Sequence, residues 1–158
     1  MQYAIITILL SAIASCSVET DQNDSSSDSI AYHDFAGRHL LINYWAEWCH
    51  PCLEEIPELN ILAQEYRDEI AIIGVNFDGL RAEEISLQRK RLGIDFPVVT
   101  EDPAIHFHYN RPEVLPTSYL FDTDQKLIAT LVGPQTRDSI LTLIRGPVGA
   151  TPDQSAPE

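Results

Sequence analysis

The stretch Trp48-Cys49-His50-Pro51-Cys52 places two cysteines with two residues between them, shortly after the largely apolar run 40–45. Such a run predicts a buried strand, so the cysteines fall where the strand passes into a helix. At the first turn of a helix, unpaired backbone N–H groups and the positive end of the helix dipole favour a thiolate. A thiolate is the species that attacks disulfides, and the motif therefore indicates a redox-active dithiol.

The residues around the two cysteines support this interpretation. His50 adds positive charge beside Cys49 when it is protonated, and Pro51 suits the first helical turn, where its missing N–H costs nothing. Trp48 is expected to shield the dithiol and to contact the substrate, whereas Trp45 is expected in the core.

The two sulfurs are expected to have different roles. Cys49 comes first and is the candidate nucleophile with the more exposed sulfur, and Cys52 lies one helical turn inward and resolves the mixed disulfide. A purely structural disulfide would close a loop of two intervening residues, which restricts the unfolded chain little.

Metal binding is the other alternative for this motif. Zinc normally takes four ligands, and only Cys16 remains besides the pair, so half of a zinc site is disfavoured. His106 and His108 have no evident third ligand and are interpreted as surface or packing residues. We expect no metal and no other cofactor.

Length and charge restrict the class of protein. The chain has 158 residues, 44% of them hydrophobic, which fits one domain with a real core. A net charge of −14 argues against nucleic acid as a partner. The single basic run, Arg89-Lys90-Arg91, is interpreted as a solvated helix face.

The N-terminal residues predict export. The run 4–10 is apolar apart from Thr7, is too short to span a bilayer, and resembles the apolar region of a secretory signal. Ile13-Ala14-Ser15-Cys16 resembles the bacterial lipobox, which implies that Cys16 is lipidated and becomes the mature N-terminus. Simple secretion, an uncleaved anchor and a buried segment remain as alternatives, because no Lys or Arg precedes the run. Ser17 implies outer-membrane sorting if the cell is Gram-negative.

Composition divides the chain into four parts. Residues 1–15 are expected to form the signal peptide, and 16–29 the lipidated cysteine with a polar, acidic tether that cannot bury enough surface to fold. Residues 30–145 form the expected globular domain, and 146–158, with three prolines, a flexible tail.

Strand and helix patterns alternate within the globular part. They predict an α/β fold in which a mixed central sheet carries helices on both faces. Strands are expected at 40–45, 70–77, 96–100, 117–121 and 127–132, the last two as a hairpin, and helices from 52, over 81–92 and 102–109, and after Thr136.

Three segments together resemble the thioredoxin superfamily, and its TlpA/ResA-like branch in particular. Residues 35–57, from Phe-Ala-Gly-Arg-His through the dithiol to Glu-Ile-Pro, are similar to the signature of that branch. Leu115-Pro116-Thr117 resembles the cis-proline loop that faces the dithiol, and Gly133 is a third match. The resemblance covers about 31–144 and implies a thioredoxin-like fold and thiol–disulfide exchange.

The resemblance assigns roles to two further positions. A cis Pro116 would present the backbone of Leu115 to an extended substrate and keep metal from the thiols. Asn43 occupies the position at which thioredoxin itself has a buried aspartate, and an amide cannot titrate. The proton needed at this site must therefore come from elsewhere.

Glu55 is the candidate source of that proton. It lies three residues after Cys52 and faces the same side of the helix, where burial would raise its pKa and suit it to exchange protons with this cysteine. ResA-like proteins carry a matching glutamate. The alternative is a solvated helix acid among Glu54, Glu55 and Glu58.

These expectations combine into one functional hypothesis. The protein is a membrane-tethered, extracytoplasmic thiol–disulfide oxidoreductase that reduces protein disulfides and is re-reduced by an upstream thiol donor. Apocytochrome c before haem attachment is one candidate substrate by resemblance. The rival hypotheses are a disulfide oxidase or isomerase on the same fold, and a thioredoxin-like module that binds extended chains without turnover.

Overall fold

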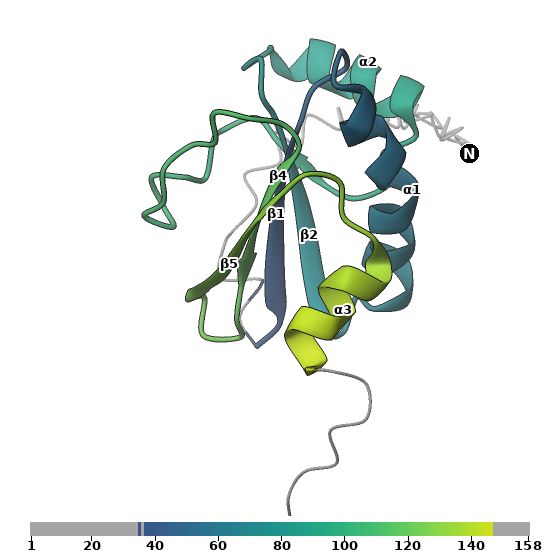
Figure 1. Ribbon diagram of the computed structural model, residues 1–158. Coiled ribbons are helices and arrows are strands. Elements are labelled where there is room, and N and C mark those ends of the chain that lie inside the picture. The colour runs from purple at the N-terminus through teal and green to yellow at the C-terminus, as the bar shows by residue number, and fades with distance from the viewer. Residues whose placement is uncertain (1–34, 36, 147–158) are drawn as a thin grey trace, which may run out of the picture.

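A five-stranded sheet forms the centre of the protein (Figure 1). The computed structural model describes Phe35 and residues 37–146, so the expected signal peptide, Cys16, the tether and all of the tail but Gly146 lie outside the described residues. The strand order is β3-β2-β1-β4-β5. The elements are β1 (His39–Trp45), α1 (His50–Glu65), β2 (Ile70–Asn76), α2 (Ala82–Leu92), β3 (Val98–Val99), β4 (Thr117–Phe121), β5 (Leu127–Val132) and α3 (Arg137–Arg145).

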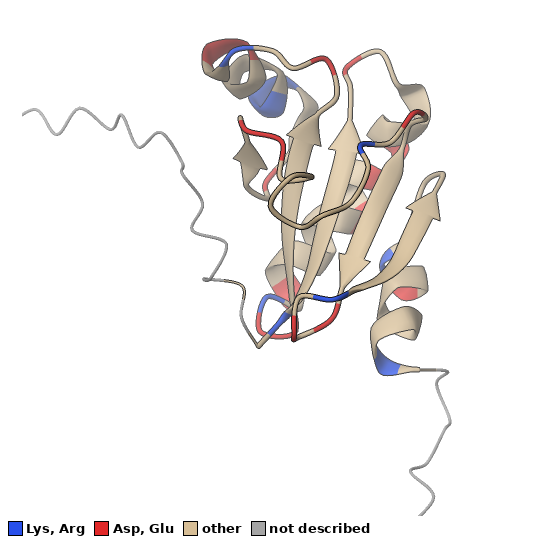
Figure 2. Cartoon of the chain, turned by 90° about the vertical axis from the view of Figure 1, so that its left-hand side faces the viewer, with Lys and Arg blue, Asp and Glu red and all other residues tan. Residues whose placement is uncertain are grey.

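The sheet is mixed, as the alternating pattern predicted. β1 pairs in parallel with β2 and antiparallel with β4, and β4 and β5 form the expected antiparallel hairpin. Among the described residues no strand contains Lys, Arg, Asp or Glu, and in Figure 2 the charged residues lie in the helices and connecting turns. A charged group buried against this sheet therefore meets no counter-ion from the strands.

The three described helices contribute their buried side chains to one core on one face of the sheet. The strands present every second side chain to that face, among them Leu41 and Trp45 of β1. The helical members of this core are Cys52, Ile56, Leu59 and Leu62 from α1, Ile85 from α2, and Ile140 and Leu141 from α3.

The opposite face carries turns where a helix was expected. Residues 103–108 form a series of turns, from which Phe107 and, just beyond them, Tyr109 pack against the second core. Asp102 does accept the N–H of Ala104, as a cap would, but His108 has a left-handed φ of 56°, which stops a helix from continuing. The prediction of a helix over 102–109 is wrong for this reason.

The carboxyl end of β1 leads into α1, and this edge of the sheet is where the dithiol lies. Trp45 is opposite Asn76 at the ends of the two parallel strands. β4 begins at the same edge, because Thr117 is opposite Tyr44. Within residues 35 and 37–146, no helix has the length and apolar character needed to cross a membrane.

Candidate active site

Cys49 and Cys52 are joined as a disulfide at the N-terminus of α1, with their Cα atoms 5.3 Å apart. Cys49 is the N-cap residue, and its Sγ accepts the backbone N–H of Cys52 at 3.3 Å. Cys49 is 4% exposed and Cys52 is fully buried, so the order of exposure agrees with the expected roles. The same N–H and helix dipole would stabilise a thiolate on Cys49 in the reduced protein.

The two residues between the cysteines occupy the first helical turn. Helix α1 begins at His50, two residues before the expected start, and Pro51 lies in its first turn, as predicted. The His50 side chain is 85% exposed, and its Nε2 lies 3.5 Å from Oε1 of Glu54. Water and this carboxylate therefore both weaken the effect of a protonated His50 on the sulfurs.

Glu55 lies fully within the core on the buried side of α1. It is 1% exposed, and its Oε1 accepts the Asn43 Nδ2–H at 2.6 Å while Oε2 accepts the backbone N–H of Gln135 at 2.9 Å. Burial raises the pKa of Glu55 to about 7, although both hydrogen bonds act to lower it. A carboxyl of this kind can take up and release a proton near neutral pH.

Asn43 links Glu55 to the neighbouring strand. Its Nδ2 also donates to Oγ of Ser118 at 3.0 Å, and the two residues are direct partners between β1 and β4. Both are buried, and Asn43 Oδ1 has no hydrogen-bond partner among the described residues. Neither Ser118 nor Gln135 was predicted from the sequence as part of this site. A polar residue two positions after Pro116, inside an otherwise buried strand, was the available signal for Ser118.

The Leu115–Pro116 peptide bond is cis, as the resemblance implied. The carbonyl oxygen of Pro116 accepts the N–H of Gly133, which ties the loop to the end of β5. Leu115 packs against the core that contains both cysteines. The loop and the dithiol therefore meet at one edge of the sheet.

Trp48 stands beside the dithiol with 66% of its surface exposed. Its Nε1–H donates to both carboxylate oxygens of Asp78 at 3.1 Å, and its ring meets the edge of Phe77 at 6.4 Å between centroids. The indole is thus held by the turn after β2 and leaves a large apolar surface open to solvent. Trp45 is fully buried, as expected.

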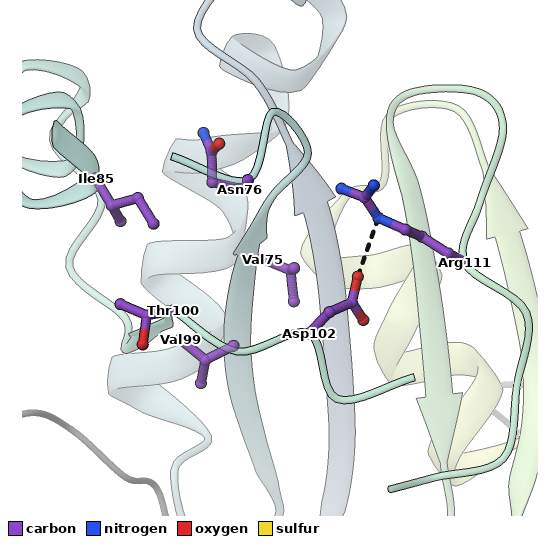
Figure 3. Close-up of a pocket in the computed structure, with 8 residues that line it drawn as sticks. Val75, Asn76, Ile85, Val99, Thr100, Asp102 and Arg111 are labelled. Atoms are coloured by element: carbon purple, nitrogen blue, oxygen red, sulfur yellow. Dashed lines mark ion pairs between the residues drawn. The ribbon is translucent and has the colours of Figure 1, made fainter. Parts of the chain in front are cut away.

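A hollow of about 280 Å³ lies beyond this turn, at the ends of β2 and β3 (Figure 3). An ion pair of 3.0 Å between Arg111 Nε and Asp102 Oδ2 forms one wall. The Arg111 guanidinium also lies over the Phe77 ring at 4.8 Å. Neither cysteine lines this hollow, whose walls are formed by Val75, Asn76, Gly79, Ile85, Val99, Thr100, Asp102 and Arg111.

The part of the chain that the structure describes has no cluster of side chains suited to a metal site. No group of three or more His, Cys, Asp or Glu side chains there is arranged to hold a metal ion. His106 packs edge-on against Phe107, and His108 occupies the left-handed turn position.

The sheet, the disulfide at the start of α1 and the cis-proline loop define a thioredoxin-like protein with a redox-active cysteine pair. The chain belongs to the AhpC/TSA family, which matches residues 14–130. It is 30% identical over 114 residues to the thioredoxin-like protein YneN of Bacillus subtilis, an alignment that covers 71% of this chain and 66% of YneN. It is also 30% identical over 121 residues to the thiol–disulfide oxidoreductase ResA of Bacillus anthracis, with 74% of this chain and 68% of ResA covered.

A solved structure shows the same fold. The DsbF homologue from Corynebacterium diphtheriae superposes with a TM-score of 0.60 at 20% identity, over 70% of this chain and 72% of the other. The chain aligns with about two thirds of the length of YneN and ResA. With its dithiol and these relatives, it is a thiol–disulfide oxidoreductase of thioredoxin-like fold.

Proposed function

We propose that this protein reduces disulfide bonds in protein substrates and that Cys49 is its nucleophile. The Cys49 thiolate attacks one sulfur of the substrate disulfide, and the second substrate sulfur leaves as a thiolate. Cys52 then attacks Cys49 Sγ, which forms the Cys49–Cys52 disulfide and releases the first substrate sulfur. The substrate gains two electrons and the protein loses two, so an upstream dithiol must reduce the pair again.

One observation carries this proposal most directly. Cys49 Sγ lies at the N-cap of α1 and accepts the N–H of Cys52, which is the position where a thiolate is most stabilised. Cys52 is fully buried behind it, which suits a sulfur that attacks only its neighbour.

Glu55 is proposed to receive the proton of Cys52 as that thiol becomes the attacking thiolate. Both residues lie on the buried side of α1, and a pKa of about 7 lets the carboxylate accept the proton and later return it. Asn43, at the position held by aspartate in thioredoxin, contributes a fixed N–H to the carboxylate and cannot titrate.

The substrate is proposed to be an extended protein segment bound across the dithiol edge. Exposed apolar surface flanks the cysteines, with Trp48 at 66% and Val114 at 54% exposure. The cis Pro116 loop, whose Leu115 packs beside the cysteines, would offer its backbone to such a segment.

The cellular location is proposed from the sequence alone. A lipid on Cys16 and the acidic tether 16–29 would hold the domain outside the cytoplasm at a bacterial membrane, the outer membrane in a Gram-negative cell. Within that compartment, apocytochrome c before haem attachment is a candidate substrate. Cys16 and the tether lie outside the described residues.

The test is reduction of insulin by the purified protein with dithiothreitol as electron source. We expect the wild type to accelerate precipitation of the insulin B chain, Cys49→Ser to abolish the effect, and Cys52→Ser to accumulate a mixed disulfide on Cys49. A wild type that binds insulin without turnover would favour the binding module, and net oxidation of a reduced protein substrate would favour the oxidase.

A further inference from the structure

Both hydrogen-bond partners of Glu55 are donors, an arrangement that suits its ionised form. The partners of its two oxygens are the Asn43 amide N–H and the Gln135 backbone N–H. A protonated carboxyl has an O–H of its own and needs an acceptor instead. The Gln135 N–H is fixed by the backbone and can only donate, whereas a side-chain amide carries an acceptor at its other end.

That acceptor is already in place and unused. Asn43 Oδ1 is buried and has no partner among the described residues, although buried carbonyl oxygens are nearly always paired. Ser118, on the other side of the amide, has a hydroxyl that can accept or donate. Half a turn of the amide would therefore aim Oδ1 at both Glu55 and the Ser118 hydroxyl.

We propose that the Asn43 amide turns over when Glu55 takes up a proton, with Ser118 as its partner in both orientations. Asn43 and Ser118 are thus positioning residues for proton exchange at the dithiol. This inference rests on the proposed function, in which the proton comes from Cys52. In the ionised state Nδ2 donates to Glu55 Oε1 and to Ser118 Oγ, and in the protonated state Oε1–H and Oγ–H both donate to Oδ1.

Neither orientation pairs both ends of the Asn43 amide. Each leaves one end of the Asn43 amide without a partner, so turning the amide exchanges one unpaired buried group for another. The charge state of Glu55 then decides which orientation is favoured. No counter-ion competes for this role, because β1 and β4 present only the uncharged Asn43 and Ser118.

The charged groups nearby are held by other contacts. On α1 itself, Glu58 Oε2 accepts the backbone N–H of Arg137, and the Arg137 guanidinium pairs with Asp138 at 3.0 Å. The loop before α3 presents Gln135 to Glu55 through its backbone. Cys52 is the remaining titratable group on the buried side of α1, and it titrates only when the disulfide is reduced.

The amide can be followed directly by NMR of the full chain in its oxidised form, labelled with ¹³C and ¹⁵N. Above the Glu55 midpoint, the Asn43 NH₂ protons should show nuclear Overhauser contacts to the Ser118 side chain, and these should disappear below it. The control is Asn60, whose amide is held at both ends by Gly93 O at 2.7 Å and the Asp95 N–H at 2.9 Å. Its contacts should stay constant across the same titration.

Variants test the role of the hydroxyl. Ser118→Ala takes the acceptor away from an Asn43 N–H when Glu55 is ionised, whereas in the protonated state Oδ1 keeps the Glu55 O–H as its partner. The Glu55 midpoint should therefore rise by about one pKa unit, a tenfold change in proton affinity. Ser118→Thr keeps the hydroxyl and should restore the wild-type midpoint. Glu55→Gln should remove the pH dependence of the Asn43 contacts altogether.

The outcomes separate this inference from the proposed function. Contacts from Asn43 NH₂ to Ser118 that persist through the Glu55 transition would overturn the inference, and so would a Ser118→Ala midpoint equal to that of the wild type. If Ser118→Ala does not fold, the wild-type comparison of Asn43 with Asn60 decides alone. Failure of insulin reduction would overturn the proposed function and leave the amide measurement unaffected.

Discussion

The indole N–H of Trp48 donates to both carboxylate oxygens of Asp78, at 3.1 Å each. The two residues are 30 positions apart, and the contact joins the loop before the dithiol to the turn after β2. It fixes the orientation of the large exposed ring beside Cys49. The surface beside the dithiol is therefore built by two loops, not by the Cys-x-x-Cys loop alone.

Removing the Asp78 carboxylate should loosen Trp48. We expect Asp78→Ala to lower the fluorescence anisotropy of Trp48 and to raise KM for a protein disulfide about fivefold, since the lost hydrogen bond contributes about 1 kcal/mol. A small disulfide reagent should react as before, because it does not contact the ring. Asp68→Ala, an exposed aspartate between α1 and β2, is the matched control. Equal KM values for Asp78→Ala and wild type would contradict this role of the contact.

The two cysteines should differ in reactivity after reduction. Cys49 receives the helix N–H and is the more exposed residue, so its thiolate should be the more stable and should react first with iodoacetamide. Peptide mapping after limited labelling measures the order. Earlier labelling of Cys52 would show that the roles are reversed.

Glu55→Gln should change how activity depends on pH. With a wild-type pKa of about 7, the rate of thiol–disulfide exchange should show a transition near neutral pH that the variant lacks. Glu58→Gln is the control, because Glu58 is only half-buried and accepts the Arg137 N–H. Superimposable pH–rate profiles for Glu55→Gln and wild type would show that Glu55 takes no part in proton exchange.

The same residue should make stability depend on pH. Because burial raises the pKa of Glu55 from 4.5 to about 7, the folded protein holds this proton more tightly than the unfolded chain. Its contribution to stability is complete below pH 4.5 and is lost as the pH rises through about 7, by an amount on the order of 3 kcal/mol. Urea unfolding at several pH values should show this loss in the wild type and not in Glu55→Gln. A loss of equal size in both proteins would assign it to other groups.

The reduction potential should lie in the reducing range, at about −200 to −270 mV. Exposure of His50 limits its effect on the sulfurs, so His50→Ala should shift the potential by less than about 30 mV. Equilibration with glutathione or dithiothreitol buffers, followed by alkylation, measures both values. A potential above about −150 mV would favour the oxidase.

Cys16 should carry the lipid that anchors the protein. In the native host, mass spectrometry should find a mature chain that begins at a lipid-modified Cys16, and Cys16→Ser should leave the membrane fraction. An intact Met1 or an unmodified Cys16 would contradict the anchor.

Local sequence was sufficient for the features that depend on neighbouring residues. The hairpin strands 117–121 and 127–132 have the predicted bounds, and Thr136 caps α3 as predicted. The helix expected over 81–92 ends at Leu92, where Gly93 caps α2. Side-chain alternation, turn residues and caps act over a few positions, so a single segment contains the information. The Cys-x-x-Cys motif at a helix start could be predicted for the same reason, because all its residues lie within one segment.

Contacts between distant segments decided where the predicted elements and the observed ones differ. Asp102 does cap a turn, but its carboxylate also accepts the Tyr44 hydroxyl and pairs with Arg111, and the stretch 103–108 becomes a series of turns against the sheet. The expected strand over 96–100 pairs only at Val98–Val99. Both outcomes depend on partners far away in the sequence, which local propensity does not encode.

The buried site around Glu55 also combines features that the sequence predicts with features that only the tertiary structure determines. The sequence by itself determined that Cys52 and Glu55 share one helix face, because helical spacing places residues three apart together. Only the tertiary structure supplied the partners of Glu55, since Asn43 reaches it from β1, Ser118 binds that amide across 75 residues, and the Gln135 N–H arrives from 80 residues away. The depth of burial and the donors that oppose it together set the pKa of Glu55, and both arise only when the sheet and helices pack against each other.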